Sequence, residues 1–193
     1  MRTSDDELLK AMKNCWDRLA KKNGLPGIFL LTGARVARNY NLLDSQFVYQ
    51  PRISAWGKRE AVERILHKYL KIRIPNSSRG VKYIYDYEKV WKRILQDANS
   101  KIDKNLYFGG VVGFDDTPRR GKEARVIQGE SPQLFERYFE KLYRLCCEHN
   151  KEFLLLTAWN EWGEGAYLEP DTINGYSYLE ALKKAVQKVD GDV

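Results

Sequence analysis

Short apolar runs alternate with helical patterns along most of the chain, and this alternation restricts the fold more than any other feature. The apolar runs carry hydrophobic side chains at consecutive positions, which is typical of strands that are buried on both faces. Patterns with apolar residues three or four positions apart, which indicate helices, separate these runs. This order of elements favours a parallel sheet covered by helices, so we predict an α/β fold with about four β-then-α units.

The strands and helices follow from these periodicities and from turn and cap residues. Strands are expected at residues 27–31, 46–51, 106–114 and 153–158. Helices are expected at residues 5–22, 55–70, 86–98, 131–149 and 175–189. Ser131 and Pro132 mark the start of the fourth helix, because serine caps a helix and proline fits its first turn. The aromatic residues Tyr83, Tyr85, Tyr87 and Trp91 are assigned to packing around the third helix rather than to a sugar-binding surface.

The length of the chain bounds its architecture. No internal repeat, low-complexity tract or linker divides its 193 residues, so we expect a single domain over residues 1–193. A barrel of eight β-then-α units needs about 250 residues. Four units therefore correspond either to a smaller open sheet or to the C-terminal half of a longer barrel.

The composition limits the location and the partners of the chain. No apolar run reaches the roughly 20 residues that span a bilayer, and no signal-peptide pattern follows Met1. Three cysteines without regular spacing argue against a disulfide framework. We therefore predict a cytoplasmic protein without a membrane span. The net charge of +7 fits solvated helix faces. Because no nucleic-acid-binding motif, nucleotide-binding fingerprint or metal-ligand spacing occurs, we expect no nucleic acid, cofactor or metal.

The strongest chemical signal follows the fourth predicted strand. Residues 157–165 read TAWNEWGEG and contain Glu161 and Glu164, with glycines at positions 163 and 165. In parallel α/β proteins, functional side chains lie at the carboxyl ends of strands. The glycines allow a tight turn that directs both carboxylates into one pocket. Two carboxylates at one glycosidic bond are the chemical groups of a glycosidase, so we predict that Glu161 and Glu164 are catalytic.

The same segment offers groups that can bind a sugar. Trp159 and Trp162 present flat apolar faces that suit sugar rings. Asn160 can hydrogen-bond hydroxyl groups through both ends of its amide. The alternative is a surface loop with two solvated glutamates, although tryptophans are seldom exposed in such a loop. We predict that these three residues bind the substrate.

A second group of polar residues follows the second and third predicted strands. Asp115, Asp116 and Arg119 come after the third strand, and Tyr49 lies at the end of the second. The aspartates suit sugar hydroxyls, and the arginine suits an anionic group. The alternative is a turn in which the aspartates cap the backbone and the arginine is solvated. We assign all four to the substrate groove, and the sequence leaves the alternative open.

The segment TAWNEWGEGAYLEPDTINGYSYLEAL, residues 157–182, resembles the C-terminal signature of the WbsX family. That family resembles glycoside hydrolase family 99, the endo-α-mannosidases, and its genes occur with those of polysaccharide biosynthesis. Residues 113–121 and 44–51 resemble further segments of the family, so the similarity extends from about residue 25 to the last helix.

This resemblance implies a TIM-type (β/α)8 barrel, of which the chain carries units five to eight. It implies that Glu161 and Glu164 match the two catalytic glutamates of the hydrolases. There the first glutamate deprotonates the sugar 2-hydroxyl, which attacks its own anomeric carbon, and the second serves as general acid and then base. The substrate is then an oligosaccharide or a polysaccharide, and the reaction is hydrolysis or glycosyl transfer.

The first four units of such a barrel are missing from the chain. A half barrel leaves two open sheet edges, which favour self-association or pairing with the missing N-terminal half. This gap motivates a second hypothesis, a non-catalytic glycan-binding or assembly remnant. A third hypothesis, a basic nucleic-acid-binding domain, rests on the net charge alone.

Overall fold

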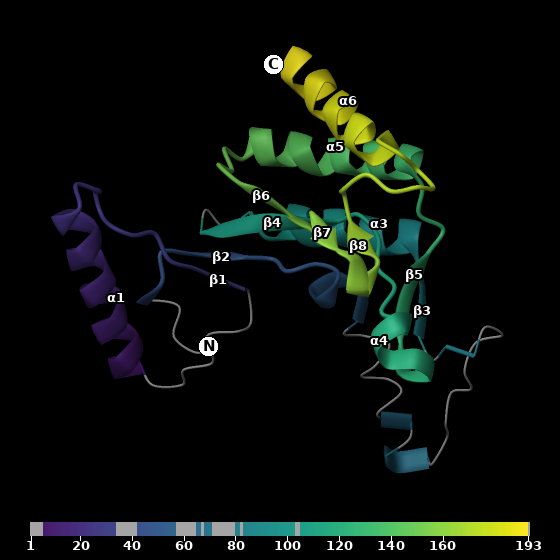
Figure 1. Ribbon diagram of the computed structural model, residues 1–193, viewed down its shortest axis with the longest axis horizontal. Coiled ribbons are helices and arrows are strands. Elements are labelled where there is room, and N and C mark those ends of the chain that lie inside the picture. Colours follow the sequence, from purple (N-terminus) through teal and green to yellow (C-terminus); the bar gives the residue numbers. More distant parts are fainter. Residues whose placement is uncertain are drawn as a thin grey trace.

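The computed structural model describes residues 6–33, 42–56, 65–66, 68–70, 80–81, 83–102 and 105–192. Its helices are α1 (Asp6–Lys22), α3 (Tyr87–Ser100), α4 (Thr117–Arg120), α5 (Pro132–Glu148) and α6 (Ser177–Gly191), with shorter helical turns η2 (Arg52–Trp56), η3 (Gly121–Glu123) and η4 (Trp162–Glu164). Its strands are β1 (Leu31–Gly33), β2 (Ser45–Phe47), β3 (Tyr83–Asp86), β4 (Leu106–Val111), β5 (Arg125–Gln128), β6 (Leu154–Thr157), β7 (Asn160–Glu161) and β8 (Ala166–Tyr167). Figure 1 shows their arrangement.

The main sheet has four strands in the order β1-β2-β4-β6, and every neighbouring pair is parallel. The predicted α/β class with adjacent parallel strands is therefore confirmed. β2 and β4 approach each other closely at Gly109, where a Cβ atom would lie 1.9 Å from the carbonyl oxygen of Val48. Only a glycine permits this approach, which brings the loop that follows β2 close to the sheet.

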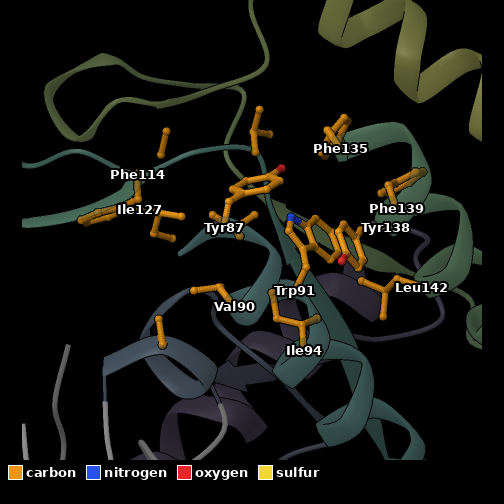
Figure 2. Close-up of a cluster of buried hydrophobic side chains, with 14 of the residues drawn as sticks. Tyr87, Val90, Trp91, Ile94, Phe114, Ile127, Phe135, Tyr138, Phe139 and Leu142 are labelled. Carbon is orange, nitrogen blue, oxygen red and sulfur yellow. The ribbon is translucent and has the colours of Figure 1, made fainter. Parts of the chain in front are cut away.

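Helices α5 and α6 pack together on one side of the sheet, and α3 contacts both β4 and α5 (Figure 1). The side chain of Ser131 accepts a hydrogen bond from the backbone N–H of Leu134 at 3.2 Å, so the predicted cap of α5 is confirmed. The helices and strands enclose an aromatic core (Figure 2). There the ring of Trp91 stacks on Tyr138, with centroids 6.0 Å apart.

Three of the four aromatic residues that the sequence assigned to packing belong to this core. Tyr87 and Trp91 are both fully buried on α3. Tyr85 is buried as well, but on β3, which pairs in parallel with β5 in a separate two-stranded sheet. The sequence did not predict this second sheet.

Among the described residues, no helix combines the length and the apolar character needed to cross a membrane.

The first strand lies later in the chain than predicted. Residues 27–30 have no regular structure, and the strand covers Leu31–Gly33. The backbone N–H of Ile28 donates to Asp17 Oδ1 at 3.3 Å, and that of Leu30 donates to Asp44 Oδ2 at 2.8 Å. Side-chain carboxylates, rather than the carbonyl groups of a strand, therefore accept the N–H groups of residues 28 and 30. The helix predicted for residues 55–70 lies largely outside the described residues.

Candidate functional site

The segment after β6 folds into a small hairpin that carries both predicted catalytic residues. β7 and β8 pair in an antiparallel manner, and the helical turn η4 connects them. Glu161 ends β7 and Glu164 ends η4, after which Gly165 adopts the left-handed conformation that closes the turn. The backbone N–H groups of Leu168 and Glu169 both donate to the carbonyl oxygen of Trp159 at 2.9 Å. This bond pair fixes the hairpin on the end of β6.

The loop after β4 packs against the hairpin. The backbone N–H of Asp115 donates to the carbonyl oxygen of Glu164 at 2.7 Å. A Cβ atom on Gly165 would lie 3.1 Å from the backbone nitrogen of Asp115, so the absence of a side chain permits this approach. The carboxylate of Asp115 accepts the backbone N–H of Thr117 at 2.8 Å and thereby supports the start of α4. Glu164 is therefore held through its backbone by the neighbouring strand end.

Arg119 and Glu164 form an ion pair. Arg119 lies on α4 and donates from Nη1 to Oε1 of Glu164. The side chain of Glu164 is 20% exposed and that of Arg119 is 54% exposed, so the pair lies at the surface. A surface ion pair contributes about 0–1 kcal/mol to folding. The contact therefore does more to orient the carboxylate than to stabilise the chain.

Asp116 has a different environment from Asp115. It is 2% exposed. Its Oδ1 accepts the backbone N–H of Arg125 at 2.6 Å, and its Oδ2 binds Nε of Arg120 at 2.7 Å. Both carboxylate oxygens are therefore engaged within the turn between α4 and β5, as in the capping alternative. The sugar contact assigned to Asp116 stays a prediction, and it would have to displace one of these bonds.

Tyr49, in the loop after β2, lies within electrostatic range of the two glutamates. Its pKa is raised above the ordinary value, first by burial of the hydroxyl and then by the negative charges of Glu164 and Glu161. The residue is 43% exposed, so its ring remains accessible from solvent while its hydroxyl is partly desolvated. The phenol therefore stays protonated at neutral pH and is available as a hydrogen-bond donor. Three predicted site residues from two strand ends thus lie within electrostatic reach of one another.

The residues assigned to sugar binding on the hairpin lie at the surface. Trp159, Asn160 and Trp162 are all exposed. The ring of Trp162 stacks on Tyr167 of β8. Its indole N–H donates to Oε2 of Glu169 at 2.8 Å. These accessible aromatic faces lie in the same hairpin as the two glutamates.

Three residues that the sequence left unassigned support the site in the structure. Gln50 is fully buried, and its amide bonds Ser54 twice, at 2.8 Å and 3.2 Å, which fixes the loop that carries Tyr49. Tyr167 and Glu169 hold Trp162 and were not assigned to the site. In the structure Tyr167 lies directly opposite Asn160 in the hairpin. Gln50 follows Tyr49 at the predicted end of the second strand and was a plausible groove residue on that ground, whereas the structure buries it.

The fold and the site place the chain in the class of parallel α/β proteins. Its two candidate glutamates lie in a hairpin after the last strand of the main sheet. The chain belongs to the family described as "Glycosyltransferase WbsX", whose pattern residues 2–182 match. This description connects the chain with glycans.

Within the described ranges, no group of three or more histidine, cysteine, aspartate or glutamate side chains is arranged to hold a metal ion.

Two relatives share part of the sequence. The chain is 32% identical over 103 residues to the uncharacterized protein WxcX of Xanthomonas campestris pv. campestris strain B100, and equally to WxcX of strain ATCC 33913. The shared segment covers 51% of this chain and 15% of each relative, so the chain corresponds to a small part of their length. No solved structure matches the chain.

Proposed function

We propose that the chain carries the glutamate-bearing half of a (β/α)8 barrel that cleaves or transfers at a glycosidic bond in an oligosaccharide or polysaccharide. Glu161 and Glu164 are its catalytic residues. The observation that carries this proposal is the hairpin that presents both glutamates at the carboxyl end of β6, where the loop after β4 bonds the backbone of Glu164 and Arg119 pairs with its carboxylate. Two carboxylates and a neutral phenol at one end of a parallel sheet suit general acid–base chemistry on a sugar.

The family resemblance suggests how the two carboxylates divide the work. Glu161 removes the proton of the sugar 2-hydroxyl, and the 2-oxygen attacks the anomeric carbon as the glycosidic bond breaks. Glu164 gives its proton to the leaving oxygen. In the second half, Glu164 takes a proton from the incoming hydroxyl, whose oxygen bonds to the anomeric carbon as the bond between that carbon and the 2-oxygen breaks, and Glu161 returns the first proton to the 2-oxygen. Water as the incoming group gives hydrolysis, and a sugar hydroxyl gives transfer.

Arg119 has a part in this scheme because it pairs with the carboxylate form of Glu164. When Glu164 carries the proton that the leaving oxygen needs, the ion pair no longer exists. The exposed guanidinium is then available for a substrate oxygen. Tyr49, which stays protonated, donates a hydrogen bond to either carboxylate or to the sugar.

The strand order supports the barrel assignment. The parallel strands of the main sheet follow one another in chain order, β1, β2, β4 and β6, as in a barrel, whereas a doubly wound sheet reverses direction at a switch point. β1 and β6 form the two edges of this sheet. We propose that residues 1–193 form one domain and that these edges pair with the remaining barrel strands or with another copy of the chain.

Turnover of α-mannoside oligosaccharides and of isolated bacterial polysaccharide tests the proposal. Glu161→Gln and Glu164→Gln keep the shape of the side chains and remove the acid–base groups. We expect each to lower kcat/KM at least about 100-fold, the usual contribution of a general acid or base. Glu152→Gln is the matched control, because Glu152 is exposed at the opposite, amino end of β6 and should leave turnover unchanged. Turnover within about threefold of the parent in both site variants would refute the assignment.

The exposed rings of Trp159 and Trp162 favour a second candidate, a glycan-binding module without turnover. In that case the parent chain binds oligosaccharide but releases no product. The two glutamate variants then bind with the affinity of the parent. The same set of proteins therefore distinguishes the two candidates.

A further inference from the structure

Trp162 is held in place on two sides although it lies at the surface. Its ring stacks on Tyr167, with centroids 3.9 Å apart and planes inclined by 22°. Its indole N–H donates to Glu169 Oε2 at 2.8 Å, and 48% of the residue is nevertheless exposed. Because Tyr167 covers one face of the indole, the exposed area belongs to the opposite face and the ring edge. The open face therefore has a fixed orientation.

The two supporting residues are themselves anchored. The backbone N–H of Glu169 donates to the carbonyl oxygen of Trp159, and Tyr167 lies in β8, paired with β7. The hydroxyl of Tyr167 bonds Asp171, which raises the pKa of the phenol after the larger effect of burial. The carboxylate of Asp171 also accepts the backbone N–H of Ile173 at 2.7 Å. The loop after β8 therefore supports Tyr167, whose ring in turn stacks on the indole.

We infer that Glu169 is a positioning residue that, together with Tyr167, fixes the open face of Trp162 as a stacking surface for a hexose ring beside Glu161 and Glu164. An aromatic face suits the apolar C–H face of a pyranose. Fixing the ring in advance removes the entropy cost of ordering it when the sugar binds. The identity of the ligand as a glycan rests on the proposed function, whereas the role of Glu169 rests on the contacts of Trp162.

Two variants of Glu169 separate positioning from direct contact. Glu169→Gln keeps an oxygen that can accept the indole N–H, and Glu169→Ala removes it. The probes are an α-linked mannotetraose and isolated bacterial polysaccharide, whose binding is measured by titration. We expect Glu169→Ala to weaken the Kd about tenfold and to raise KM while kcat stays unchanged. Glu169→Gln should remain within about twofold of the parent.

A spectroscopic readout follows the ring itself. The difference between the parent and Trp162→Phe in near-ultraviolet circular dichroism and in acrylamide quenching isolates the signal of Trp162. We expect Glu169→Ala to reduce the dichroism and to increase the quenching of Trp162, and Glu169→Gln to preserve both. An unchanged Trp162 signal in Glu169→Ala overturns the inference even if the melting temperature falls, because Glu169 is then structural only.

The binding and turnover measurements give further outcomes that either support or overturn the role of Glu169. If Glu169→Gln weakens binding as much as Glu169→Ala, the carboxylate itself contacts the sugar, and the positioning role is overturned. If the parent binds neither probe, the stacking surface is overturned. Binding that follows the expected pattern without turnover supports the inference while the proposed catalysis fails. Loss of turnover in Glu161→Gln with an unchanged Kd supports both.

Discussion

Replacement of Gly165 by alanine tests whether close packing between two loops holds Glu164. Gly165 has φ +55°, and a residue with a Cβ atom in this left-handed region costs about 1–2 kcal/mol. The new Cβ would also lie 3.1 Å from the nitrogen and 3.2 Å from the Cβ of Asp115, so Asp115 must shift. Such overpacking costs about 1–3 kcal/mol. The reduced entropy of the unfolded chain offsets about 0.4–1 kcal/mol, so we expect a net loss of about 1–5 kcal/mol.

Gly175→Ala is the matched control for this variant. Gly175 has φ +54°, but nothing lies within 4 Å of an added Cβ atom, so only the backbone cost remains, about 1 kcal/mol. Urea unfolding of both variants gives the two free energies. Because the shift of Asp115 also disturbs its bond to the carbonyl oxygen of Glu164, Gly165→Ala should lower turnover, whereas Gly175→Ala should not. Equal losses of stability in the two variants would refute the packing argument.

Two further predictions concern the α5–α6 region. Ser131→Ala removes the cap that accepts the N–H of Leu134 and should lower the free energy of unfolding by about 1 kcal/mol in urea titrations, and a loss below about 0.3 kcal/mol would contradict the cap. The pKa of Glu140 is lowered chiefly by its bond to Lys188, against burial, and also by Arg144. The ionised Glu140 side chain therefore stabilises the fold at pH values above its ordinary pKa of 4.5. This stabilisation is lost as the pH falls through the lowered pKa that Glu140 has in the folded protein. Glu140→Gln should melt below the parent at pH 7, and this difference should disappear as the pH falls through the lowered folded pKa of Glu140; a constant difference would argue against the ion pair.

The elements that local sequence specifies were predicted well. The apolar runs of β4 and β6 and the Ser131 cap depend on neighbours in the chain, and the structure confirms them. The first strand was misplaced because two carboxylates that lie elsewhere in the sequence, on Asp17 and Asp44, take the backbone N–H groups of residues 28 and 30. The β3–β5 pair was missed because two short strands pair across a separation that no periodicity reveals.

In the candidate site, too, local sequence predicted some features, whereas others depend on residues that are distant in the chain. The segment of Glu161 and Glu164 stood out from residue types and glycine spacing alone, and its catalytic role stays a proposal. The two aspartates looked equivalent in the sequence. In the structure Asp115 packs on the hairpin through its backbone, whereas Asp116 is buried against Arg120 and the backbone of Arg125.

The sequence by itself determined the parallel α/β class, the family, and the segment after the last strand of the main sheet that bears the chemical groups. These depend on periodicity and on motifs within a few residues. Only the tertiary structure decided that Arg119 pairs with Glu164, that Tyr49 lies within electrostatic range of both glutamates, and that Glu169 holds Trp162. The first two arrangements join loops from different strand ends, and parallel pairing brings those ends together. The third depends on the hairpin turning back on itself, so side-chain geometry rather than local pattern sets it.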